Sequence, residues 1–338
     1  MLLLSIESSC DDSSIALTEI TTRKLLLHRK ISQEAEHARY GGVVPELASR
    51  LHAVDLPRLL EGAKEYFDAV SAVAVTNEPG LAVTLNEGVM MAKSFAIFQK
   101  LPLVPVHHLK GHIWSLFIEK PTRLPLLVIL ISGGHTMILR VEGLEAMEIL
   151  ATSMDDSVGE SYDKVAKMMG LGYPGGPIVE ALAREGDPER FDLPVPLRNS
   201  PLIAFSLSGL KNAVRLVVEK LGGAGAMSEQ DRRDLAASFQ KALIAHLIQK
   251  SRKLFAAESI PDVALVGGAS ANLAIRGAFE RLCGEFGKRL HTAPLEFCSD
   301  NAAMIGRYGI DALAAGFAID PSEIRVRPNR KLQSGMQL

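Results

Sequence analysis

Short aliphatic runs separated by polar turns open the chain. Residues 2–6 form the first run, residues 7–14 are a polar stretch rich in serine and aspartate, and apolar runs return at 15–17 and 25–27. Runs of this length, bounded by turn-forming residues, are typical of β-strands. The pattern therefore predicts a strand, a tight polar turn, a second strand and a third strand.

The next part of the chain changes to a helical period. Apolar residues recur at near-helical spacing after Pro45, and a second helical pattern covers residues 84–98. Short aliphatic runs at 72–75 and 103–106 alternate with these helices. Three strands followed by alternating helices and strands indicate an α/β lobe.

The same order of elements then recurs. Residues 124–131 are aliphatic, residues 132–136 form a Ser-Gly-Gly-His-Thr turn, and apolar runs return at 137–139 and 147–150. This recurrence predicts a second lobe built like the first. A length of 338 residues also favours two domains, and two lobes imply a cleft.

Breaks in the pattern give the expected boundaries. We expect a first lobe of residues 1–118 plus about 300–338 and a second lobe of residues 119–299. Turn-rich and amphipathic sequence at about 184–230 interrupts the second lobe, and the α/β pattern resumes with an aliphatic run at 263–266. The interruption is expected to be a helical insertion.

Composition narrows the class of protein. The 37 basic and 39 acidic residues give a formal net charge of −2, so no global charge attracts a polyanion. A local basic group, Arg325, Arg327, Arg330 and Lys331, is a candidate nucleic-acid contact, with a solvated terminus as the alternative. Three scattered cysteines without CxxC spacing exclude a disulfide framework and a cysteine-ligated zinc finger.

The longest unbroken apolar stretch, residues 124–131, is far shorter than the ~18 residues that cross a bilayer. The first residues lack the basic segment of a signal peptide and soon reach Glu7. We therefore expect a cytoplasmic protein that makes no membrane contact.

Glycine turns are candidate anion-binding sites. Residues 132–136 join two predicted strands, and residues 267–272 lie between a strand and a helix. Backbone N–H groups in such turns can approach a phosphate closely, so with the turn at 173–177 they could line a nucleotide pocket, although a tight hairpin also explains the first turn. In the matching turn of the first lobe, Asp11 and Asp12 could bind a metal, orient a nucleophile, or bond only to nearby backbone.

A histidine pair is the strongest sign of metal chemistry. His108 and His112 are four residues apart in a predicted helix, so both imidazoles lie on one helical face. Asp300 is a candidate third ligand, and two histidines with one carboxylate suit Fe(II), with zinc as the alternative. A zincin protease needs glutamate directly after the first histidine, whereas this chain has Leu109.

A set of motifs lies in register along nearly the whole chain. They are Ser8-Ser9-Cys10-Asp11, the run 41–50, His108 with His112, the turn 132–136, the run 155–160, Asp163-Lys164, the turn 173–177, the run 205–211, Gly267-Gly268, Asn272 and Asp300-Asn301. Each motif is weak alone, but their combination and order are highly specific. Together they resemble the TsaD family, the tRNA N6-adenosine threonylcarbamoyltransferases.

The resemblance implies the actin/Hsp70/sugar-kinase fold, two duplicated ribonuclease-H-like lobes around a nucleotide cleft. It implies transfer of the threonylcarbamoyl group of threonylcarbamoyladenylate to N6 of the adenosine immediately 3′ of the anticodon, in tRNAs that read codons beginning with A, with release of AMP. It assigns His108, His112 and Asp300 to a divalent metal, and we add Asp11 as a candidate proton acceptor for the attacking amine. It assigns the adenylate to Ile131, Ser132, Gly133, Gly134, His135, Asp163, Gly176, Glu180 and Asn272.

The resemblance also implies partner proteins. The Ser-Cys-Asp form of the first turn is of the bacterial type, which implies a TsaB-like paralogue docked on first-lobe helices and a TsaE-like ATPase. Residues 78–88 depart from the family pattern, because charged and amide side chains such as Glu78 and Asn86 replace glycine and apolar residues. This departure concerns the docking surface more than the chemistry.

Rival functions remain open from the residues alone. An ATP-dependent small-molecule kinase of the same fold would share the glycine turns, but it would hold Mg²⁺ through oxygen ligands and need no histidine pair. A metalloprotease is disfavoured by Leu109. A non-catalytic scaffold, like the family's inactive paralogue, is disfavoured by the intact set of His108, His112 and Asp300.

Overall fold

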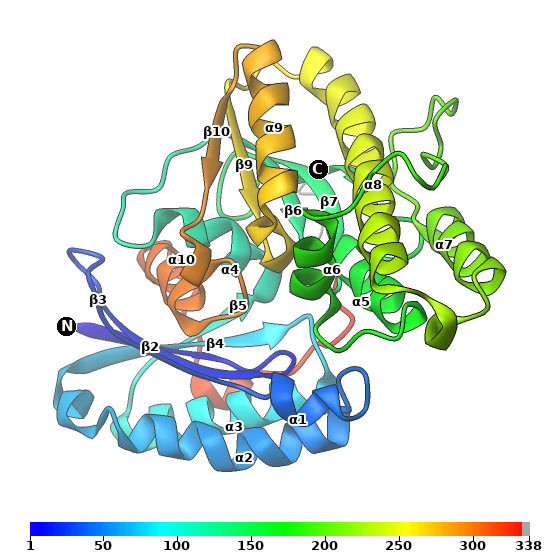
Figure 1. Cartoon of the computed structure of the whole chain (residues 1–338). Coiled ribbons are helices and arrows are strands. Elements are labelled where there is room, and N and C mark those ends of the chain that lie inside the picture. The colour runs from blue at the N-terminus through cyan, green and yellow to red at the C-terminus, as the bar shows by residue number, and fades with distance from the viewer. Residues whose placement is uncertain (333–338) are drawn as a thin grey trace. The chain divides into compact units, whose positions relative to one another are not determined.

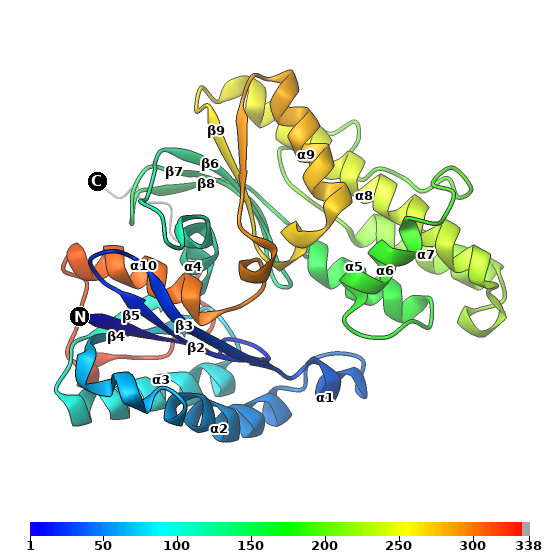
Figure 2. The same ribbon diagram turned by 60° about the vertical axis from the view of Figure 1, so that its left-hand side comes forward.

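The computed structural model describes residues 1–332. Its contacts divide the chain into two units, one made of Met1–Leu124 with the chain from Ala293 onward, the other of Pro125–Thr292. These ranges begin and end a few residues from the boundaries expected from the sequence. Each unit contains a five-stranded sheet flanked by helices (Figures 1 and 2).

The first sheet has the strand order β3-β2-β1-β4-β5. β1 pairs antiparallel with β2 and parallel with β4. At the two edges of the sheet, β3 pairs antiparallel with β2 and β5 pairs parallel with β4. The strands are β1 (Leu2–Glu7), β2 (Asp12–Glu19), β3 (Leu25–Ser32), β4 (Val70–Glu78) and β5 (Leu103–His107). The helices are α1 (Glu34–Ala38), α2 (Pro45–Glu61), α3 (Ala82–Gln99), α4 (His108–Trp114) and α10 (Ala302–Ala314), with 3₁₀ turns η1 (Lys64–Ala69), η2 (Ser115–Phe117), η5 (Leu295–Phe297) and η6 (Pro321–Glu323).

Alternate residues of β1 face opposite layers of helices. Leu4 and Ile6 join the hydrophobic cluster that α2 and α3 form against one face of the sheet. Ser5 faces the other side, where its Oγ donates a hydrogen bond to the Ala302 carbonyl of α10 at 2.7 Å. A strand that is buried on both faces reads as a continuous apolar run, which is why the run at residues 2–6 predicts it well.

The second sheet repeats this topology, with the order β10-β9-β6-β7-β8. β6 pairs antiparallel with β7 and parallel with β9, as β1 does with β2 and β4. The internal repeat and the two-lobed α/β fold class expected from the sequence are thus confirmed. The strands are β6 (Leu126–Ile131), β7 (Thr136–Val141), β8 (Met147–Thr152), β9 (Asp262–Val266) and β10 (Arg289–Thr292). The helices are α5 (Val158–Met168), α6 (Gly175–Ala183), α7 (Ser208–Lys220), α8 (Glu229–Ala257) and α9 (Leu273–Glu285), with 3₁₀ turns η3 (Ala224–Ala226) and η4 (Gly268–Ala271).

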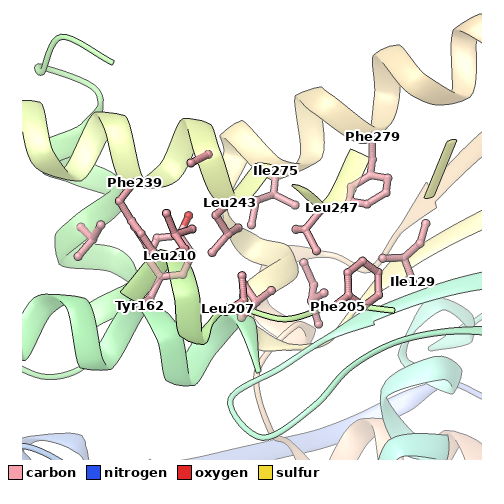
Figure 3. Close-up of a cluster of buried hydrophobic side chains, with 14 of the residues drawn as sticks. Ile129, Tyr162, Phe205, Leu207, Leu210, Phe239, Leu243, Leu247, Ile275 and Phe279 are labelled. Atoms are coloured by element: carbon pink, nitrogen blue, oxygen red, sulfur yellow. The ribbon is translucent and has the colours of Figure 1, made fainter. Parts of the chain in front are cut away.

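Helices from distant parts of the second unit share one core. Figure 3 shows Ile129 of β6 and Phe279 of α9 in the same buried cluster as Phe239 of α8 and Leu210 of α7. Burial of such side chains contributes about 1.5–3 kcal/mol each. The long α8 therefore belongs to the core of the unit and is not a peripheral addition.

The expected helical insertion is only partly correct. Residues 185–207 contain no helix, and their one pairing is an isolated bridge from Phe205 to Ser153. Prolines such as Pro194 and Pro196 remove backbone donors that a helix requires. The buried Lys250 holds this segment instead, because its Nζ donates hydrogen bonds to the carbonyls of Leu197, Ser200 and Leu202.

Among residues 1–332, none of the helices is long and apolar enough to cross a bilayer. The three cysteines, Cys10, Cys283 and Cys298, are free thiols.

Acidification should destabilise the second unit through His246, which lies fully buried in α8. Its Nε2 accepts a hydrogen bond from the Ser206 backbone N–H at 3.2 Å, and burial, helped by the charge of Lys250, lowers its pKa to about 4. As the pH falls from 6.5, the ordinary pKa of histidine, to about 4, the unfolded chain binds a proton at His246 that the folded chain does not bind. The free energy of unfolding therefore falls by up to about 1.4 kcal/mol per pH unit in this range. Urea unfolding of the full chain across this window measures the loss. The His246→Gln variant should show a flatter pH dependence, and an unchanged slope would assign the acid sensitivity to other groups.

Candidate functional site

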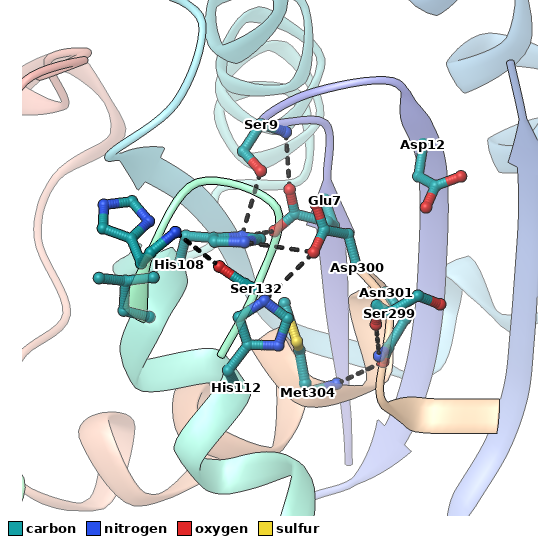
Figure 4. A network of polar contacts seen from close by, with 12 residues as sticks. Glu7, Ser9, Asp12, His108, His112, Ser132, Ser299, Asp300, Asn301 and Met304 are labelled. Carbon is teal, nitrogen blue, oxygen red and sulfur yellow. Dashed lines mark hydrogen bonds and ion pairs between the residues drawn. The ribbon is translucent and has the colours of Figure 1, made fainter. Parts of the chain in front are cut away.

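The candidate metal ligands meet in the first unit. α4 begins at His108 directly after β5, which puts His108 and His112 one helical turn apart. Asp300 lies just before α10, whose N-cap is Asn301. Its Oδ1 is 3.3 Å from Nε2 of His108 and 3.2 Å from Nε2 of His112 (Figure 4). Ligand atoms from the three side chains lie within 4.8 Å of one another.

Close packing of α10 brings Asp300 to the histidines. A Cβ on Gly306 would lie 2.7 Å from Ser5 Oγ, and one on Gly309 would lie 2.8 Å from Ala74 Cβ. At the other contact, a Cβ on Gly111 of α4 would lie 2.7 Å from Ile305 Cδ1. Only glycine allows backbones to approach this closely, so these residues set the distance between α4, α10 and the sheet.

Burial and neighbouring charges shift the pKa values of all three candidate ligands. Burial disfavours the charged form of His108, but the carboxylates of Asp300 and Glu7 outweigh it and raise the pKa of His108 well above its usual range. Burial likewise opposes ionisation of Asp300, whereas His108 and His112 hold the pKa of Asp300 well below its usual range. Burial lowers the pKa of His112. The cluster therefore combines an ionised carboxylate with a neutral His112, and a bound cation would take the place of the Nε2 proton of His108.

These residues fit a divalent cation. His112 is fully buried, and neither of its ring nitrogens has a hydrogen-bond partner of good geometry among the described residues, although Nε2 faces Asp300. A buried polar atom left unpaired costs about 1–3 kcal/mol, so an orphaned imidazole aimed at a carboxylate indicates a missing ligand. Two imidazoles and one carboxylate suit Fe(II) or zinc.

Asp11 and Asp12, in the turn after β1, differ in their contacts. Asp12 begins β2 and accepts a hydrogen bond from Lys30 Nζ at 2.8 Å, and burial raises its pKa to about 7 despite that lysine. Lys30 also reaches the backbone carbonyl of Asp300 at 3.4 Å. Asp11 is partly exposed and forms no ion pair with residues 1–332, so its carboxylate is the more available one. Burial and Asp11 raise the pKa of the Cys10 thiol, which disfavours a cysteine nucleophile.

In the second unit, the glycine turns lie at one sheet edge, because β6 and β9 are adjacent and parallel. The turn after β6 closes through a hydrogen bond from the Ser132 N–H to the His135 carbonyl at 2.8 Å. Gly133 and Gly134 have open space where a Cβ would stand. Gly267 has φ +95°, and a Cβ at this position would lie 2.4 Å from the Ile131 carbonyl oxygen, so only glycine fits there.

Helix N-termini surround these turns. Ser157 caps α5 and its Oγ donates to the Gly133 carbonyl. The Oδ1 of Asp163 accepts a hydrogen bond from the Gly175 N–H at 2.7 Å, at the start of α6, where Gly176 borders open space. The positive ends of helix dipoles favour bound anions, so this edge suits a phosphate.

Two of the expected adenylate residues also have structural roles. Asn272 caps α9, with Oδ1 accepting from the Ile275 N–H and Nδ2 donating to Gln240, both at 2.9 Å. Glu180 Oε1 accepts from the Leu273 N–H at 2.9 Å and thereby joins α6 to α9. Their direct contact with adenylate stays a prediction.

The local basic group at residues 325–331 contacts the segment 78–88. Arg327 and Arg330 lie 3.9 and 3.6 Å from the carboxylate of Glu78, while both remain partly exposed. Gly80 and Gly88 come so close to Ser9 and Ser8 that a Cβ at either position would clash with the first turn. Backbone hydrogen bonds join the same two segments, from the Arg327 N–H to the Asn77 carbonyl at 2.9 Å and from the Gly80 N–H to the Pro328 carbonyl at 3.1 Å.

Sequence reasoning missed Glu7 and Lys30. Both contact the ligand cluster, yet Glu7 lies at the end of an aliphatic strand and Lys30 in a half-exposed one, where nothing in the pattern singles them out. The one available signal was a lone charge directly following the aliphatic run at residues 2–6.

Comparison with known proteins gives consistent results. The family model of TsaD, the tRNA N6-adenosine threonylcarbamoyltransferase, matches residues 24–307. A protein of Sulfurovum sp. bearing that name is 70% identical over 337 residues, covering 100% of both chains. Another from Wolinella succinogenes is 59% identical, covering 97% of this chain and 98% of its own.

Solved structures at low identity share the fold. HypF in its phosphate- and nucleotide-bound form superposes with a TM-score of 0.61 at 14% identity, covering 93% of this chain and 46% of HypF. Component A of the Acidaminococcus fermentans (R)-2-hydroxyglutaryl-CoA dehydratase gives a TM-score of 0.54 at 14% identity, covering 93% of this chain and 99% of that one. These likenesses support the two-lobed α/β architecture.

We expect the chain to bind about one divalent ion, and the double variant His108→Ala/His112→Ala to retain less than about a tenth of that amount, because carboxylate alone is a poor ligand set. Metal analysis of the purified proteins after reconstitution with Fe(II) or Zn²⁺ measures the difference. His52→Gln serves as the matched control, since His52 is equally buried in the same unit but bonds to Ser13 and the Cys10 carbonyl. Equal metal content in the double variant would place the ion elsewhere.

Proposed function

Because the chain belongs to the TsaD family of tRNA N6-adenosine threonylcarbamoyltransferases, we propose that it transfers the threonylcarbamoyl group of threonylcarbamoyladenylate to tRNA. The acceptor is N6 of the adenosine immediately 3′ of the anticodon in tRNAs that read codons beginning with A. The observation that carries the proposal is the buried cluster of His108, His112 and Asp300, which a kinase of this fold does not need. Because the proposed substrate is a tRNA, we also infer a cytoplasmic location.

The reaction needs no covalent enzyme intermediate, because the mixed anhydride is already activated. The amine nitrogen bonds to the carbamoyl carbon, the bond from that carbon to the phosphate oxygen breaks, and AMP leaves with the electron pair. One proton must leave the amine. Asp11 is our candidate acceptor, since its carboxylate is partly exposed and lies in the turn beside the ligand cluster.

Each unit contributes a different function. In the first unit, His108, His112 and Asp300 would hold a divalent cation, Fe(II) in preference to zinc, and such a cation supplies Lewis-acid polarisation of a carbonyl oxygen. In the second unit, the adenylate would be bound by the backbone of residues 131–135 and by the side or main chains of Asp163, Gly176, Glu180 and Asn272. This assignment is supported by the glycine turns and helix N-termini at one sheet edge.

A TsaB-like paralogue is the proposed docking partner on α2 and α3, with a TsaE-like ATPase completing the system. α3 presents an apolar stripe to solvent in which Val83, Met90 and Ile97 repeat every seven residues, and the neighbouring Phe98 is 82% exposed. Exposed apolar side chains aligned along one helix are typical of an interaction surface.

The activity test is transfer of radiolabelled threonine to tRNA by the full chain, supplied with both partners and a source of threonylcarbamoyladenylate. Wild type should label tRNA, and His108→Ala/His112→Ala should not. Asp11→Asn should keep its metal and transfer about 10²–10⁴-fold more slowly, as expected when a general base is lost. Normal transfer by Asp11→Asn would remove Asp11 from the mechanism. Failure of wild type where a homologue succeeds would overturn the proposed function.

The docking surface is tested with Met90→Lys and Phe98→Glu. Because both side chains are exposed, we expect unchanged thermal stability and metal content but binding to the TsaB-like paralogue weakened by at least about tenfold. Leu216→Lys is the matched control, since Leu216 is an exposed apolar residue on α7 of the other unit. Sedimentation of the mixed proteins gives the affinities. Equal weakening by all three variants would mean that the effect is not specific to α3.

A further inference from the structure

Glu7 is a buried carboxylate held by three donors. It ends β1 and has no exposed surface. Its Oε1 accepts a hydrogen bond from the Ser9 backbone N–H at 2.6 Å, and its Oε2 accepts one from Thr76 Oγ1 at 2.5 Å. The same Oε2 lies 3.1 Å from His108 Nδ1 (Figure 4). The sheet and the first turn therefore fix this carboxylate independently of the histidine.

The contact with Glu7 defines the state of the His108 ring. An ionised carboxylate only accepts hydrogen bonds, so Nδ1 must carry the proton that it donates. Ser9 Oγ lies 3.1 Å from the same Nδ1 and offers a second acceptor. Because Glu7 keeps the proton on Nδ1, the nitrogen that loses its proton when a cation binds is Nε2, which faces Asp300 at 3.3 Å.

His112 has no equivalent support. Its Nδ1 is buried without a hydrogen-bond partner among the described residues. The two histidines of the cluster thus differ, because His108 is oriented by a carboxylate and His112 is oriented by its place in α4 alone. Carboxylate partners of this kind orient metal-ligating histidines and make them more basic ligands.

We propose that Glu7 is a positioning residue for the metal centre: by accepting the Nδ1 proton of His108, it presets Nε2 as the ligand atom. The inference rests on the proposed metal site at His108, His112 and Asp300. Glu7 acts through His108 and touches neither substrate nor metal.

The first experiment compares the metal affinities of wild type, Glu7→Gln and Ser13→Ala by competition of Zn²⁺ with a chromophoric chelator. Glutamine offers one acceptor oxygen where three donors converge, so we expect the affinity of Glu7→Gln to fall about 10–100-fold. Ser13→Ala is the matched control, because it removes an equally buried hydrogen bond of 2.7 Å to His52, which is no ligand. It should stay within about twofold of wild type. The Co²⁺ absorption spectrum of Glu7→Gln should also change, which a merely structural defect would not cause in the folded fraction.

The second experiment uses wild type alone and does not depend on the folding of a variant. Long-range ¹H–¹⁵N correlation spectra of the Zn²⁺-loaded chain report which ring nitrogen of His108 is protonated, with His108→Ala identifying the signals. We expect a protonated Nδ1 and a metal-bound Nε2. The opposite arrangement, or Glu7→Gln with unchanged affinity and Co²⁺ spectrum, would overturn the inference. If wild type binds no divalent metal at all, the proposed metal site itself fails.

Discussion

The close packing of α10 on the first sheet is the constraint on which the candidate metal centre depends. Asp300 and its histidine partners are almost two hundred residues apart in sequence, and they meet only because Gly306 and Gly309 let α10 approach β1 and β4. Trp114 of α4 adds a hydrogen bond of 2.8 Å from Nε1 to Asp311 of α10. The helix that carries both histidines is thereby locked to the helix that follows the carboxylate.

The repeated topology explains where chemistry-bearing residues gather. In each unit, three parallel strands lie side by side next to two strands that pair antiparallel, and loops that follow parallel strands emerge at the same edge. His108 follows β5 in the first unit, while the turns at 132–136 and 267–272 follow β6 and β9 in the second. One supersecondary plan thus supplies an imidazole cluster in one copy and an edge of glycine turns, the candidate anion site, in the other.

Because burying a charge costs free energy, the ionisable residues of the cluster depend on one another. Glu7 is fully buried, and burial opposes its ionisation, yet His108 and the side chain of Ser9 hold its pKa below the usual range. A charge in the interior is tolerated only when it is paired and hydrogen-bonded, and removing one partner leaves the others uncompensated. α3 shows the opposite arrangement, because its apolar side chains Val83, Met90 and Ile97 are exposed.

The sequence by itself determined the repeat, the strands, the histidine pair and the family, because these depend on local periodicity and on spacing within a few residues. Only the tertiary structure decided that residues 185–207 are irregular, since Lys250 anchors them from a helix about fifty residues away. It alone also showed that Glu7 contacts His108 and that Arg330 lies beside Glu78. Such partners are brought together by packing between elements, and no pattern along the chain records which element will lie beside which.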